Sequence, residues 1–95
     1  MDVPLTRRYV LFYDYVTENV IERRAPHRDA HLDLVREWLG DGRVLMAGAL
    51  GDPPHGAALV FAVDDPGEVE RFAQADPYVT SGLVTAWRVE PWNLV

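Results

Sequence analysis

The sequence contains neither cysteine nor lysine, and its nine cationic residues are all arginine. Without cysteine, the chain cannot form disulfides, use a thiolate nucleophile or bind a metal through sulfur. Without lysine, it cannot form a Schiff base through a side-chain amine. No apolar run approaches about 18 residues, so we expect no segment that crosses a membrane. Residues 1–4 are not a basic region leading into an apolar one, so we expect no signal peptide and a cytoplasmic location.

The chain has 95 residues, of which 48% are hydrophobic, and a formal net charge of −6. This length predicts one domain over residues 1–95. An acidic chain without a basic block is not typical of proteins that bind phosphate backbones, so we expect no nucleic-acid partner. A domain of this size buries a thin core, and association with a second copy would increase the buried surface.

Residues 7–16 are rich in aromatic and β-branched side chains, which predicts a strand. Its alternating positions form two faces, with Tyr9 and Tyr13 on one and Phe12 on the other. Both faces are largely apolar, so we expect both to be covered.

Residues 17–26 are polar and predict a loop or a short helical turn, after which residues 26–39 predict an amphipathic helix. One buried stripe is formed by His27, His31, Leu34, Val35 and Trp38, which recur at helical spacing, and is widened by Leu32 and Leu39.

Residues 44–50, 57–63 and 84–89 predict further strands, and a second helix begins near Pro66 and ends at Asp76. Residues 78–83 predict a connecting turn or short helix. The order β-α-β-β-α-β predicts a ferredoxin-like α+β fold, an antiparallel sheet with helices on one face. We expect a second subunit to cover the other face, giving a homodimer that packs sheet to sheet.

His31 and Asp76 are the candidate catalytic pair. His31 lies on the apolar stripe near the start of its helix, where an imidazole can act as a general acid or base. The alternative is a partly buried histidine that bonds only to backbone, which is common in protein cores. Asp76 either orients the imidazole or simply ends a helix, because Asp-Pro is ordinary turn chemistry.

A metal site is a weaker hypothesis. His27 and His31 are four residues apart, a spacing that zinc sites use. Asp29 does not occupy the place of a metalloprotease glutamate, and no third ligand stands out, so we expect no metal and no cofactor. His55 lies in a loop rich in proline and glycine and is expected to be solvated.

Aromatic side chains can line a pocket for a small ligand, although they are more often core or interface residues. Arg28, one turn before His31, can hold an anionic group or merely be solvated. The candidate substrate-binding residues are Arg28, Tyr9, Phe12, Tyr13 and Tyr78, with Trp87 and Trp92 as further pocket candidates.

Several stretches resemble the YCII-related (YciI-like) family. They are the Arg-x-x-His run at 28–31 with the Gly-Arg and Ala-Gly pairs at 42–43 and 47–48, the Ala-Asp-Pro-Tyr run at 75–78 with the ending at 90–92, and the first strand at 9–13. Together they cover nearly the whole chain in the order and spacing typical of the family.

The resemblance implies a ferredoxin-like fold that dimerises through its sheets, as in the dimeric α/β barrels. It also implies an active-site pair at His31 and Asp76. Family functions include removal of chloride from chlorinated hydroxyquinols, and related barrels include lactone isomerases and cofactorless monooxygenases. This chain departs from many relatives at Gly48-Ala49 and in its short loop, 50–56. Both departures border the expected pocket, so the substrate class is not carried over.

Two functions follow as hypotheses. The first is a small enzyme in which His31 moves a proton on a small cyclic or carbonyl-bearing substrate, by elimination or isomerisation, while Asp76 fixes the imidazole tautomer. The second is a non-catalytic domain that binds a small ligand, or a partner, in the dimer cleft.

Overall fold

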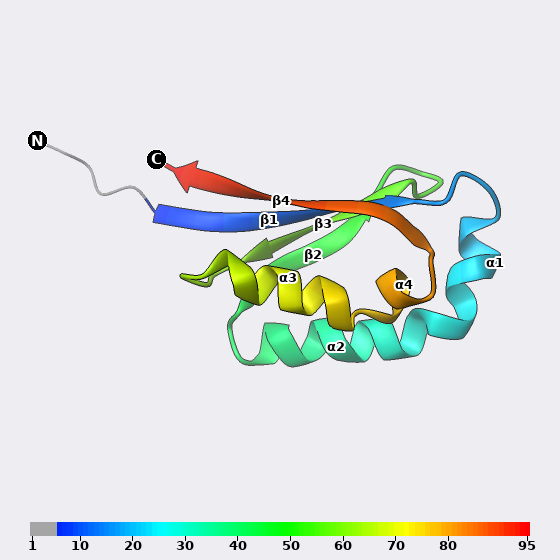
Figure 1. The fold of residues 1–95 in the computed structure, drawn as a ribbon, viewed down its shortest axis with the longest axis horizontal. Helices are drawn as coiled ribbons and strands as arrows, with labels where there is room; N and C mark the ends of the chain where they lie inside the picture. Colours follow the sequence, from blue (N-terminus) through cyan, green and yellow to red (C-terminus); the bar gives the residue numbers. More distant parts are fainter. Residues whose placement is uncertain (1–5) are drawn as a thin grey trace, which may run out of the picture.

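The computed structural model of the chain describes residues 6–95 (Figure 1). The expectation that the chain has no signal peptide concerns residues 1–4, which lie outside the described residues. In chain order the elements are β1 (Thr6–Tyr15), α1 (Val20–Arg24), a 3-10 turn (Ala25–His27), α2 (Arg28–Gly40), β2 (Val44–Leu50), β3 (Gly56–Phe61), α3 (Pro66–Ala75), α4 (Pro77–Thr80) and β4 (Val84–Leu94). The predicted order β-α-β-β-α-β is confirmed, with two short helical insertions.

The four strands form one antiparallel sheet in the order β2-β3-β1-β4. The helices α2 and α3 run along the same face of this sheet (Figure 1). This arrangement confirms the predicted ferredoxin-like α+β fold. No helix in residues 6–95 has both the length and the apolar character needed to cross a membrane.

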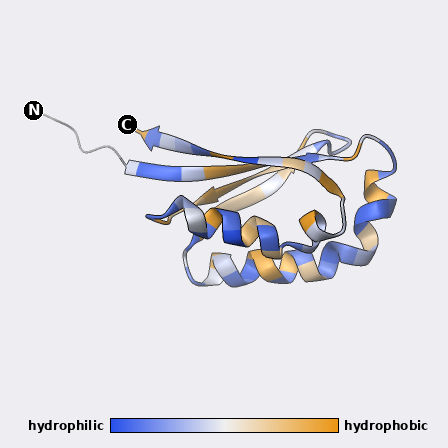
Figure 2. Ribbon diagram, in the orientation of Figure 1, coloured by the Kyte–Doolittle hydropathy of each residue, from blue (hydrophilic) through white to orange (hydrophobic). Residues whose placement is uncertain are grey.

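The core lies between the sheet and the helices. Both long helices alternate polar and apolar residues, so each can bury one stripe against the sheet (Figure 2). Trp38, Phe61 and Phe72 meet edge to face, with ring centroids 5.2 to 5.8 Å apart. Such geometry adds about 0.5–1.5 kcal/mol per pair to the effect of burial itself. This aromatic cluster joins α2, α3 and β3.

The helical segments differ from the sequence prediction at their ends. The main helix begins at Arg28 rather than Pro26. The segment before it, predicted as a loop or a short helical turn, forms the short helix α1 and a 3-10 turn. Pro26 sits inside the 3-10 turn, where its fixed φ is tolerated. Leu39 was expected to widen the buried stripe, and that prediction is wrong: its side chain is 41% exposed at the last turn.

The last strand is longer than predicted, because β4 continues past residue 89 to Leu94. Pro91 does not stop it, because β4 is an edge strand with a single neighbour and the missing N–H breaks no ladder bond on its outer side. The third strand is shifted instead, since β3 ends at Phe61 rather than at residue 63.

The two faces of β1 have different environments. The face that carries Tyr9 and Tyr13 is buried under the helices. Within residues 6–95, no helix covers the other face (Figure 1). There Val10, Phe12 and Trp92 border a hollow of about 410 Å³, which we call the open-face hollow. The expectation that both faces are covered is met on one side only within the described chain.

Candidate active site

His31 and Asp76 are in direct contact, although 45 residues separate them in sequence. The imidazole Nδ1 lies 2.8 Å from Asp76 Oδ1 and 3.0 Å from Oδ2. The His31 side chain is 12% exposed, whereas Asp76 is completely buried. The expected spatial pairing of the two residues is confirmed.

Three donors converge on the Asp76 carboxylate. The Tyr13 hydroxyl donates to Oδ2 at 2.8 Å, and the Tyr78 backbone N–H donates to Oδ1 at 3.0 Å. The imidazole Nδ1 is the third group, and since an ionised carboxylate only accepts hydrogen bonds, its partner nitrogen carries the proton. The contact with the Tyr78 N–H is also the N-cap of α4, so one Asp-Pro turn both starts a helix and places the carboxylate.

Tyr78 holds the imidazole from the side. The two rings stack with centroids 3.8 Å apart and an interplanar angle of 5°. With one nitrogen bonded to Asp76 and one ring face covered, the orientation of His31 is set by two independent contacts. No hydrogen bond of Nε2 is found within residues 6–95, so this nitrogen remains available to a ligand.

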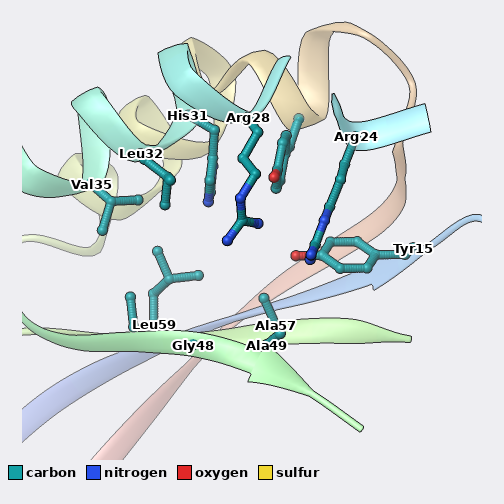
Figure 3. A pocket seen from close by; sticks show the side chains of 12 residues that line it. Tyr15, Arg24, Arg28, His31, Leu32, Val35, Gly48, Ala49, Ala57 and Leu59 are labelled. Carbon is teal, nitrogen blue, oxygen red and sulfur yellow. The ribbon is translucent and has the colours of Figure 1, made fainter. Parts of the chain in front are cut away.

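His31 borders a hollow of about 260 Å³ between α2 and the sheet, which we call the His31 hollow. Figure 3 shows Arg28 and Arg24 reaching into this space from the helices, with Leu59 and Ala57 below them on the sheet. The full lining consists of Tyr15, Arg24, Arg28, His31, Leu32, Val35, Ala47, Gly48, Ala49, Ala57, Leu59 and Tyr78. It combines an apolar floor with cationic and hydroxyl groups and contains no carboxylate.

Two tyrosines on β1 stay protonated at neutral pH. Burial first, and then the charge and hydrogen bond of Asp76, raises the pKa of the Tyr13 hydroxyl far above its ordinary value. Burial also raises the pKa of Tyr15 from its ordinary 10.0 to about 12. The guanidinium groups of Arg24 and Arg28, which line the same hollow, act against this rise in the pKa of Tyr15. Each tyrosine is therefore a hydrogen-bond donor at neutral pH.

The candidate substrate-binding residues fall into three places. Arg28 and Tyr78 line the His31 hollow. Tyr13 lies behind the hollow, where it holds Asp76, and Tyr9 is part of the core. Phe12 lies on the opposite face of the sheet, in the open-face hollow, because alternate strand residues point to opposite faces. The structure therefore does not bring Phe12 to the His31 hollow.

The two tryptophans also lie away from the His31 hollow. Trp87 packs on the edge of the core, and Trp92 borders the open-face hollow with 48% of its surface exposed.

Two lining residues escaped the sequence reasoning. Arg24 precedes Arg28 by four residues, about one helical turn, and Tyr15 follows Tyr13 on the same face of β1. Both spacings were visible in the sequence. For Arg24 the signal was weak, because residues 17–26 were predicted as a loop or a short helical turn, and in a loop a four-residue spacing has no meaning.

The other histidines stay apart from this pair. His27 is half-buried before α2, and His55 is exposed, as expected, in the loop before β3. Within residues 6–95, no three side chains of histidine, aspartate or glutamate gather as a metal site would require.

The family model of the YCII-related domain matches residues 8–93. The chain therefore belongs to the YCII-related family, as its motifs indicated. No curated protein matches this sequence.

Two solved structures are similar to the fold. One is a 5-chloro-2-hydroxyhydroquinone dehydrochlorinase from Burkholderia phenoliruptrix AC1100, in complex with 2,5-dihydroxybenzoquinone; it is 20% identical, with a TM-score of 0.75 over 90% of this chain and 92% of that one. The other is a dimeric ferredoxin-like protein from an uncultured marine organism, 16% identical, with a TM-score of 0.54 over 97% of this chain and 90% of that one. At these identities the two structures establish the shared fold.

Proposed function

We propose that the chain is a small enzyme that uses His31 and Asp76 for general acid–base chemistry without a metal. The observation that carries the proposal is the short bond between Nδ1 and the buried carboxylate, with Nε2 left free beside the His31 hollow. Asp76 keeps the proton on Nδ1, so the unprotonated Nε2 of a neutral imidazole can take a proton from a substrate. The carboxylate then stabilises the imidazolium that forms.

Proton abstraction from a small cyclic or carbonyl-bearing substrate fits this equipment best. The His31 hollow, at about 260 Å³, suits a compact molecule, and its apolar floor suits a ring. Loss of a proton next to a carbonyl leads to isomerisation, or to elimination when a leaving group is present. The similar dehydrochlorinase supports an elimination, because its name describes the removal of hydrogen chloride.

We further propose that the protein is a homodimer joined through the open face of the sheet. That face carries the open-face hollow and exposed apolar side chains, among them Met46 and Trp92, which are 61% and 48% exposed. A contiguous apolar surface of this kind marks an interface. The similar marine protein is described as dimeric, which supports the same assembly here.

Proton exchange provides the test of catalysis. The protein would be incubated in D₂O with small cyclic ketones, lactones and chlorinated hydroxyhydroquinones, with exchange followed by NMR and chloride release measured in parallel. We expect turnover of at least one class and a loss of about 10²–10⁴-fold in His31→Gln, the usual contribution of a general base. His27→Gln is the matched control and should retain full activity.

The imidazole tautomer gives a second readout. Nitrogen-15 shifts of His31 should show the proton on Nδ1, and Asp76→Asn should mix the two tautomers while the protein remains folded. The proposal fails if His31→Gln turns over as fast as the parent protein. Binding of these compounds without any exchange or chloride release would instead favour the alternative, a non-catalytic domain that binds small ligands in the dimer cleft.

A further inference from the structure

Two arginines enter the His31 hollow without an anionic partner. Arg24 ends α1 and Arg28 begins α2, four residues later, and both line the hollow (Figure 3). Within residues 6–95, neither guanidinium has a carboxylate within 4.0 Å, although the chain carries 15 acidic residues against nine basic ones. Other arginines of residues 6–95 also lack such a partner, but Arg24 and Arg28 are the two that line the His31 hollow together.

The two guanidinium groups are placed where they repel each other. Like charges four residues apart on a helical run repel each other. Arg28 also occupies the first residue of α2, where the helix dipole disfavours a cation. An anion bound by both guanidinium groups would offset the repulsion between them.

Hydroxyl groups complete the same wall of the hollow. Tyr15 lines the hollow with both arginines, beside Arg24 (Figure 3), and its protonated hydroxyl offers one more donor. Tyr78 is almost completely buried, lines the hollow, and has a hydroxyl with no hydrogen-bond partner within residues 6–95. A buried polar group without a partner is unfavourable, and a ligand oxygen would give this hydroxyl one.

We infer that the His31 hollow binds a compact organic carboxylate, with its anionic oxygens held by Arg24 and Arg28 and its apolar body lying between α2, at Leu32 and Val35, and Leu59 on the sheet. The guanidinium fork matches the two oxygens of a carboxylate. The inference names the substrate class of the proposed enzyme and rests on that proposal for its choice of site. It places the carboxylate beside His31, so the remainder of the molecule faces Nε2.

Benzoate and its neutral isostere benzamide are the probes. Each would be titrated into the full-length protein while the His31 ring protons are followed by NMR, with His31→Gln used to assign them. We expect benzoate to bind at least tenfold more tightly than benzamide. Added salt should weaken benzoate binding and leave benzamide unaffected, because charge attraction is screened.

Single arginine substitutions test which side chains bind the carboxylate of benzoate. Arg28→Gln and Arg24→Gln should each weaken benzoate about tenfold, which corresponds to about 1.4 kcal/mol, and should leave benzamide unchanged. Arg28→Lys should give a smaller loss because it keeps the charge and loses the fork. The matched controls are Arg36→Gln on α2 and Arg23→Gln on α1, which change the net charge equally but remove exposed arginines that do not line the hollow.

Several results would overturn the inference: benzamide binding as tightly as benzoate, control variants losing as much benzoate affinity as Arg28→Gln, or no response of His31 to benzoate at millimolar concentration. The failure of the catalytic proposal looks different. In that case benzoate binding would depend on the arginines while His31→Gln left proton exchange unchanged. Conversely, proton exchange that depends on His31 but not on either arginine would support the catalytic proposal and contradict the proposal that the substrate is a carboxylate.

Discussion

The two faces of the sheet use similar residues for different purposes. On the helix-covered face, Tyr13 is buried and its hydroxyl bonds to Asp76. On the open face, one residue away in sequence, Phe12 is half-buried and has the guanidinium of Arg88 4.3 Å above its ring. The covered face holds polar groups in fixed positions, whereas the open face presents apolar surface.

This difference between the two faces arises from their exposure to solvent rather than from residue type. A carboxylate shielded from solvent must have its acceptors satisfied, so its neighbours are ordered. A cation over an exposed ring keeps its water and is constrained only weakly. Fixed geometry, which acid–base chemistry requires, is therefore expected on the covered face and association on the open face.

The largest effect should come from removing the buried carboxylate. Asp76→Ala leaves the Tyr13 hydroxyl and the His31 imidazole without their acceptor and removes the N-cap of α4. We expect a loss of about 3–5 kcal/mol in the free energy of unfolding, measured by urea denaturation. Asp65→Ala is the control, because it removes an exposed N-cap from α3 and should cost only about 1 kcal/mol. Similar losses in both variants would contradict the distinction.

A substitution on the open face should change the association of the subunits rather than the stability of each subunit. Trp92→Glu places a carboxylate in the proposed dimer interface, and we expect the dimer to dissociate about a hundredfold more readily, as seen by sedimentation velocity. The secondary structure of the subunit should be unchanged because Trp92 is half-exposed. Gln74→Glu adds the same charge at an exposed position of α3 and should not affect assembly. A parent protein that sediments as a monomer at micromolar concentration would reject the interface.

Alkaline pH should weaken the covered face. Folding raises the pKa of Tyr15 from 10.0 to about 12, so its contribution is complete below 10.0 and is lost as pH rises through 12. A pKa rise of this size corresponds to roughly 2–3 kcal/mol in the free energy of unfolding. Tyr15→Phe should therefore lose less stability than the parent protein between neutral and strongly alkaline pH, as measured by guanidinium chloride unfolding. An identical alkaline loss in the two proteins would show that Tyr15 is not responsible.

The smallest effect should come from the exposed cation. Arg88→Gln removes the contact over Phe12, and we expect a loss of no more than about 1 kcal/mol, since both partners retain solvent. Thermal unfolding of the variant should shift by a few degrees at most. A loss as large as that of Asp76→Ala would mean that the open face is as rigidly organised as the covered one.

Much of the fold was predictable from local pattern. Alternation in β1, the apolar stripes of α2 and α3, and the proline and glycine signals specify elements because each depends on neighbours within a few residues. The same pattern placed His31 on a buried stripe and Asp76 at a helix end. The family motifs made their pairing an expectation. Strand and helix ends were less accurate, as Leu39 and the extension of β4 show.

The surroundings of His31 and Asp76 depend on how distant segments of the chain come together. Local pattern identifies the residues that can be buried, but α1 and α2 had to be positioned over the sheet before Arg24 and Tyr15 could line one hollow. The alternation in β1 already separated Phe12 from Tyr13, but the folded chain shows which of the two faces the helices cover. The physical reason is that hydrophobic periodicity reports a direction toward the core, whereas a site depends on contacts between segments far apart in the chain.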